Sequence, residues 1–187
     1  MDAVLMIDMQ QGYFSDPDLE EQRPALVDAC SRLVRGALDA GALVVEVVTV
    51  HEHDRSTWAR NMLEDDKPFL LRGSEEAARL PGLPEVGPPN GVVLEKTRDS
   101  AFHRTDLVDL LHERGIDRLL LCGISTESCI GATALDAYSH DFETVLVADA
   151  IASPSQDSHV RTLDHLGRSY RQPGVGVADV LPTLTGA

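Results

Sequence analysis

The sequence predicts a three-layer α/β/α sandwich built around a central, mostly parallel sheet of about six strands. Short apolar runs alternate along the chain with longer amphipathic stretches, which is typical of strands followed by helices. Most of the apolar runs have no polar face, as in parallel strands that helices cover on both sides. The 187 residues suffice for one sizeable core, so we expect a single domain over residues 1–187.

The strands are expected where apolar and β-branched residues gather in short runs. The runs are AVLMID (3–8), ALVVEVVTV (42–50), GVVLEK (91–96), RLLLCG (118–123) and TVLVADA (144–150), with a weaker sixth at GVGV (174–177). Because each is separated from the next by enough residues for a crossover, the sheet can be parallel throughout.

Four helices are expected between and after these strands, at residues 25–41, 105–115, 128–140 and 155–170. The first repeats apolar residues at helical spacing and closes at Gly41, and the second begins at a capping Thr105 and ends at Gly115. The proline-rich stretch 51–90 reads as loop with short helix. It is too long for a plain connection, so we expect it to carry part of a site.

The composition excludes several classes of partner. The net charge is −15, from 31 acidic and 16 basic residues, which argues against nucleic-acid and anionic-membrane binding because both need surplus Lys and Arg. The N-terminal apolar run is broken by Asp8, so it predicts neither a signal peptide nor a membrane span. Three cysteines without CxxC spacing predict neither a disulfide scaffold nor a cysteine zinc site, and we expect a cytoplasmic protein.

Three reactive residues fall at the carboxyl ends of predicted strands, where ligands gather in open parallel sheets. Asp8 follows the first strand, Lys96 ends the third, and Cys129 lies just past the fourth, in the first turn of a helix. The helix N-terminus and a nearby lysine would lower the pKa of the thiol, and an aspartate could take its proton. A nucleophile, a base and electrostatic support together indicate an acyl-transfer reaction on a small-molecule substrate.

Each of these residues also has a plain structural interpretation. Cys129 could be a packing residue, Asp8 a turn or helix cap, and Lys96 a solvated loop lysine. For Cys122, inside an apolar strand, and for Cys30, on the inward face of a helix, packing is the prediction.

Three blocks of sequence resemble the isochorismatase-like cysteine hydrolases. This family includes nicotinamidases, N-carbamoylsarcosine amidase, ureidoacrylate amidohydrolase and isochorismatase itself. The blocks are LMIDMQQGYF (5–14), LEKTRDSAFHRTDLVDLLHERGI (94–116) and CGISTESCIGATALDAYSHDFETVLVADA (122–150). They occur in the family's order, each at a predicted strand end, and the resemblance extends from the first strand to about residue 170. It implies a Rossmann-like sheet topology.

The resemblance also implies roles for particular residues. Asp8 corresponds to the general base, Lys96 to the catalytic lysine and Cys129 to the nucleophile. A non-proline cis peptide bond would fall between Ile124 and Ser125, and would turn the Ser125 N–H toward an oxyanion beside the Cys129 N–H. Family members are commonly dimers or tetramers, so a homo-oligomer is expected.

The presence of Cys129 favours hydrolysis of a C–N bond in an amide, carbamoyl or ureido group through a thioester, because true isochorismatases lack this cysteine. Two alternatives stay open. The first is isochorismatase-type ether hydrolysis, and the second is a non-catalytic, redox-responsive protein on the same fold.

The sequence HEHD at 51–54 raises the question of a metal. Two histidines and an aspartate can bind a divalent ion, and nicotinamidases carry one near this position in a pattern that begins with aspartate. Here His51 stands at that first position and no third histidine follows nearby, so we predict no metal and no other cofactor. His51 is expected to line the substrate pocket, as His53 also could. Trp58 is expected either to cover the pocket or to pack its loop onto the body.

Overall fold

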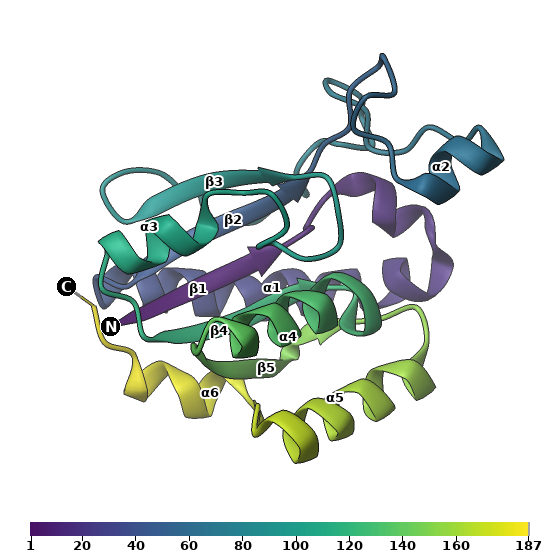
Figure 1. Ribbon diagram of the computed structural model, residues 1–187. Coiled ribbons are helices and arrows are strands. Elements are labelled where there is room, and N and C mark those ends of the chain that lie inside the picture. Colours follow the sequence, from purple (N-terminus) through teal and green to yellow (C-terminus); the bar gives the residue numbers. More distant parts are fainter. Residues whose placement is uncertain (187) are drawn as a thin grey trace.

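The structure is a computed structural model, and it describes residues 1–186. Its centre is a six-stranded sheet in which every strand is parallel to its neighbours, in the order β3-β2-β1-β4-β5-β6 (Figure 1). The strands are β1 (Asp2–Ile7), β2 (Leu43–Thr49), β3 (Gly91–Lys96), β4 (Arg118–Ile124), β5 (Glu143–Ala152) and β6 (Gly174–Val175). The predicted α/β fold with a parallel sheet of six strands is therefore confirmed.

Helices cover both faces of the sheet. The α-helices are α1 (Pro17–Asp39), α2 (Arg60–Asp65), α3 (Leu107–Glu113), α4 (Gly131–Ser139), α5 (Gln156–Tyr170) and α6 (Val177–Val180). Two 3-10 turns, η1 (Gln11–Ser15) and η3 (Leu181–Thr183), and one π-helical turn, η2 (Thr126–Ile130), complete the elements. In Figure 1, α1 runs behind the sheet while α3 and α4 lie in front of it, and α2 stands out on the long connection between β2 and β3.

The core forms two apolar layers, one on each side of the sheet. Alternate residues of β1 divide between them: Val4 and Met6 pack with α1 and α6, whereas Leu5 and Ile7 pack with α3 and α4. All four side chains are buried, which is the physical reason why the strand has no polar face in the sequence. Cys30 and Cys122 lie in the first of these layers, fully buried, as the sequence predicted.

The first helix is longer than predicted. It begins at Pro17 rather than at residue 25, because the Asp16 carboxylate accepts hydrogen bonds from the Asp18 and Leu19 N–H groups and caps the new start. Pro24 lies inside the helix, where it removes one N–H donor without ending it. The helix that was predicted over residues 128–140 is divided into the η2 turn and α4.

Within residues 1–186, none of the helices combines the length and the apolar character that crossing a membrane requires.

Candidate active site

The sheet order brings the predicted site residues to one edge. β1 lies between β2 and β4, so Asp8, Thr49 and the chain leading to Cys129 leave adjacent strands at their carboxyl ends. Lys96 ends β3, one strand farther out, and its long side chain reaches across the end of β2. The structure thus brings Lys96 together with Asp8, 88 positions away along the chain, and with Cys129, 33 positions away.

The three side chains are in direct contact and shielded from water. The Lys96 Nζ donates to Asp8 Oδ2 at 2.8 Å and lies 3.4 Å from the Cys129 Sγ. Asp8 is 0% exposed, Lys96 1% and Cys129 4%. Because a charged pair removed from water persists only with good geometry and further hydrogen bonds, such an arrangement is typical of a functional site. The loop-lysine interpretation of Lys96 is wrong, because its ammonium is buried among these groups.

Thr49 is a fourth member of the cluster that the sequence analysis did not find. Its hydroxyl accepts from Lys96 Nζ at 2.7 Å and donates to Asp8 Oδ1 at 2.8 Å, so it bridges the two charges. Gln10 in turn holds Thr49: its side-chain amide accepts from the Thr49 N–H and donates to the Thr49 carbonyl. The only sequence signal for Thr49 was a hydroxyl at the end of an otherwise apolar strand.

The pKa of Cys129 is raised, contrary to the prediction of a lowered one. Burial is the main cause and the Asp8 carboxylate is the second, and together they outweigh the Lys96 ammonium, which acts in the opposite direction. The pKa of Lys96 is raised as well. Burial alone would lower it, but attraction to Asp8 and Cys129 prevails. The resting site therefore pairs a lysine ammonium with an aspartate, beside a protonated thiol.

The loop between β4 and Cys129 has the backbone that the resemblance implied. The Ile124–Ser125 peptide bond is cis. The Ser125 carbonyl accepts from the N–H groups of Ser128 and Ile130, which fixes the turn that carries Cys129. The assignment of the Ser125 and Cys129 N–H groups to an oxyanion stays a prediction.

A small pocket of about 220 Å³ adjoins the cluster at Thr49. Its lining combines aromatic, apolar and polar side chains, namely Tyr13, Thr49, His51, Ala59, Asn61, Met62, Phe69, Thr97, Arg98 and Asp99. His51 is among these residues, and its contact with a substrate stays a prediction. Trp58 is not in this lining: it is 7% exposed, and its indole N–H donates to the Glu52 carbonyl, so it packs the loop onto the body.

The residues of the HEHD stretch have separate partners. The His51 Nδ1 lies 3.0 Å from the Thr57 carbonyl, which requires a proton on that nitrogen. Burial lowers the pKa of His51, so its ring is neutral near pH 7. The His53 Nε2 lies 2.9 Å from the Arg72 carbonyl, and the Asp54 carboxylate accepts from the Ser56 N–H. Over residues 1–186, no three His, Cys, Asp or Glu side chains gather as metal ligands.

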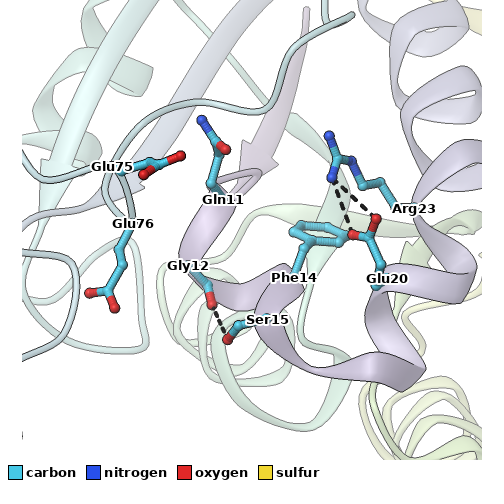
Figure 2. A pocket seen from close by; sticks show the side chains of 8 residues that line it. All are labelled: Gln11, Gly12, Phe14, Ser15, Glu20, Arg23, Glu75 and Glu76. Carbon is cyan, nitrogen blue, oxygen red and sulfur yellow. Dashed lines mark hydrogen bonds and ion pairs between the residues drawn. The ribbon is translucent and has the colours of Figure 1, made fainter.

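A larger cavity of about 390 Å³ lies beside η1 and contains none of the three cluster residues (Figure 2). Glutamates line it from two segments, and the one arginine there, Arg23, is paired with Glu20. The cavity is therefore acidic and distinct from the pocket at Thr49.

A family model described as an isochorismatase domain matches residues 2–179, which is nearly the whole chain. The chain belongs to the isochorismatase family. The resemblance inferred from its three sequence blocks is thereby confirmed.

Two curated members of the isochorismatase family illustrate its range. The maleamate amidohydrolase of Pseudomonas putida is 35% identical over 177 residues, which cover 90% of this chain and 80% of that protein. The phenazine biosynthesis protein PhzD1 of Pseudomonas aeruginosa is 32% identical over 164 residues, which cover 87% of this chain and 77% of that protein. The sequence relatives thus include an amidohydrolase.

Solved structures of the isochorismatase family share the fold. An isochorismatase family protein from Desulfovibrio vulgaris superposes with a TM-score of 0.86 at 28% identity, over 97% of both chains. The nicotinamidase PncA of Bacillus subtilis superposes with a TM-score of 0.80 at 27% identity, over 93% of this chain and 98% of that one. Fold and family together identify the chain as an isochorismatase-family hydrolase.

Proposed function

We propose that this hydrolase cleaves the C–N bond of a small amide, carbamoyl or ureido substrate through a thioester on Cys129. The observation that carries the proposal is the buried contact of Lys96 with both Asp8 and the Cys129 sulfur. It supplies a nucleophile, a carboxylate base and a fixed positive charge within reach of one another. The amidohydrolase and nicotinamidase among the relatives support the same class of bond.

The first half of the reaction transfers the acyl group to sulfur. Asp8 takes the thiol proton as the Cys129 sulfur attacks the substrate carbonyl carbon, and the C=O electron pair moves to oxygen. The N–H groups of Ser125 and Cys129 hold the resulting oxyanion. When the C–N bond breaks, the proton on Asp8 passes to the departing nitrogen, which leaves as ammonia or an amine. The product that stays is the thioester.

The second half releases the acid. Asp8, ionised again, takes a proton from water as the water oxygen attacks the thioester carbonyl. Collapse of the intermediate breaks the C–S bond, and the sulfur recovers the proton from Asp8. Lys96 stays protonated throughout and holds a fixed positive charge against the Asp8 carboxylate, while the Thr49 hydroxyl bridges the two groups.

The raised pKa of Cys129 gives Asp8 a specific role in the proposed reaction. Because the resting thiol is protonated, its proton must leave as the bond between sulfur and the carbonyl carbon forms. Asp8 therefore acts as a general base in this step. A preformed thiolate would not need that base. The proposal therefore predicts that removal of the Asp8 carboxylate abolishes acylation, not only later turnover.

Ether hydrolysis of the isochorismatase type is the second candidate, since the family model that matches is described as an isochorismatase domain. In that reaction the Asp8–Lys96 pair would act as acid and base without the thiol. The two candidates differ in one measurable respect: only amide hydrolysis by this route requires Cys129.

The test measures ammonia release from nicotinamide, N-carbamoyl amino acids, ureido acids and half-amides, with wild type and Cys129→Ala in parallel. Cys30→Ala is the matched control, since Cys30 is a buried cysteine of the other core layer. We expect activity in wild type and in the control only, and a thioester on Cys129 detectable by mass spectrometry after rapid acid quench. Hydrolysis that survives Cys129→Ala would refute the covalent route.

The predicted homo-oligomer and cytoplasmic location stay predictions. Sedimentation velocity of the purified protein would test the first, since a monomer of 20.3 kDa is well separated from a dimer or tetramer.

A further inference from the structure

Arg98 is a half-buried cation in the pocket beside the Asp8–Lys96–Cys129 cluster. None of the ion pairs within residues 1–186 involves it. Its Nη1 donates to the carbonyls of Thr57 and Thr97 at 2.7 and 2.5 Å, and its Nη2 donates to the Trp58 carbonyl at 3.2 Å. The guanidinium is thus anchored by neutral groups, and its charge has no counter-ion in the described part of the chain.

The anchoring leaves one edge of the guanidinium unused. A guanidinium has five N–H donors in a fixed plane. Nη1 donates to two of the anchoring carbonyls and Nη2 donates to one, the Trp58 carbonyl. The Nε–H and the second Nη2–H have no partner in the described chain. Nε and Nη2 lie on the same edge of the guanidinium, and that edge can bind a carboxylate through two parallel hydrogen bonds.

The charges around Arg98 favour an anionic ligand over a cationic one. Asp99 also lines the pocket, but it is exposed to solvent and so is hydrated without a ligand. Arg98 is half-buried, so water screens its charge less. His51, its neighbour in the lining, is neutral near pH 7 and does not compete for an anion. The protein carries a net charge of −15, so a local cation is needed if an anion is to bind at all.

The rest of the lining limits the size of the ligand. The Tyr13 and Phe69 rings meet edge to face, with centroids 5.2 Å apart, and together with Met62 they form an apolar wall. The pocket volume of about 220 Å³ lies below the usual range for drug-sized ligands, which begins at about 300 Å³. The ligand that fits is short, with an apolar middle.

We propose that Arg98 binds a carboxylate on the substrate, so that the substrates are short amides that carry a free carboxylate away from the scissile bond. This inference rests on the proposed function for the identity of the reacting group. Arg98 acts as a specificity residue: its free edge orients the acid end while the amide end lies at Cys129.

Binding in the absence of turnover tests the inference separately from the chemistry. Calorimetry on the Cys129→Ala protein compares succinamate, the half-amide of a four-carbon diacid, with its neutral methyl ester. We expect succinamate to bind at least about tenfold more tightly than the ester, the size expected of a charge-assisted pair. Addition of Arg98→Gln should abolish that preference, mainly by weakening the binding of succinamate.

The ratio of the two affinities separates recognition from folding. Arg98→Gln also removes donors to loop carbonyls, but a loosened loop weakens both ligands alike and leaves the ratio unchanged. Arg60→Gln is the matched control, because Arg60 is 91% exposed, pairs with Glu64 and lies outside the pocket lining. It should keep the full preference. Circular dichroism verifies the fold of each variant.

Two results would overturn the inference. The first is a preference for succinamate that is equally strong with and without the Arg98→Gln substitution. The second is an absence of succinamate binding at about 10 mM, a concentration that would detect even a millimolar affinity. The proposed function fails in a different way. If succinamate binds with the Arg98-dependent preference but the wild-type enzyme releases no ammonia from any amide, the carboxylate site stands and the amidohydrolase proposal is wrong.

Discussion

Replacement of Lys96 by methionine removes the ammonium that contacts Asp8 while it nearly preserves the length of the side chain. The side chains of both partners are fully buried, and Lys96 also donates to Thr49 and Cys129. Loss of one partner of a buried ion pair costs about 3–5 kcal/mol because the remaining charge is left without compensation. Methionine fills most of the vacated volume, so the cavity contribution is small. We therefore expect the free energy of unfolding to fall by about 3–5 kcal/mol.

Urea denaturation followed by circular dichroism measures this loss at pH 7. The pKa of Lys96 is raised in the folded protein, so its stabilising charge is fully present below its ordinary value of about 10.4 and is lost as the pH rises beyond it. The gap between wild type and Lys96→Met should accordingly be the same at pH 7 and pH 9, and should narrow above about pH 10.4.

The double variant Asp8→Asn/Lys96→Met provides the control, since it removes both charges and leaves none unpaired. It should be more stable than Lys96→Met alone, although both lack activity. A loss below about 1 kcal/mol for Lys96→Met would refute the reasoning, because the pair would then behave as if it were exposed to water. So would a double variant as unstable as the single one.

Three further predictions follow from single contacts. Alkylation of Cys129 by iodoacetamide, followed by peptide mass spectrometry, should accelerate continuously from pH 7 to 10 because the pKa is raised, and a plateau near pH 7 would contradict this. Thr49→Val should lower kcat about tenfold with little change in KM, since it removes the hydroxyl between Asp8 and Lys96 but nearly preserves the shape of the side chain. Steady-state kinetics on the variant, with its fold verified by circular dichroism, would show this. Gly123→Ala should cost at least about 2 kcal/mol in urea denaturation, because its Cβ would overlap the Ile7 carbonyl oxygen. Gly73→Ala, with a similar positive φ but open space around it, should cost only about 1 kcal/mol.

The fold could be predicted because its main determinant is local. A strand buried on both faces needs apolar residues at every position, and β1 and β4 meet this requirement almost without exception. The start of α1 could not be placed in the same way. The cap at Asp16 lies before a stretch of charged residues with Pro24 inside it, and only the folded chain shows that the helix tolerates that proline.

The candidate site could be predicted as far as the ends of the strands could be predicted from the sequence. Asp8, Lys96 and Cys129 each follow or end an apolar run, and the topology of a parallel sheet brings such positions together. Thr49 was missed because threonine is an ordinary strand residue, and its role depends on two contacts across the sheet. The pKa of Cys129 was predicted in the wrong direction because a helix terminus can be read from sequence, whereas the degree of burial beside Asp8 cannot.

The raised pKa of Cys129 argues against the alternative of a redox-responsive protein. Oxidation of a cysteine by peroxide proceeds through the thiolate and requires access from solvent. Cys129 is 4% exposed, and burial and Asp8 hold its proton in place. The site keeps its charge in the Asp8–Lys96 pair, so the sulfur becomes nucleophilic only when a substrate carbonyl lies beside it and Asp8 can take the proton. Such an arrangement protects the thiol between turnovers, which suits a hydrolase and would make a poor sensor of oxidants.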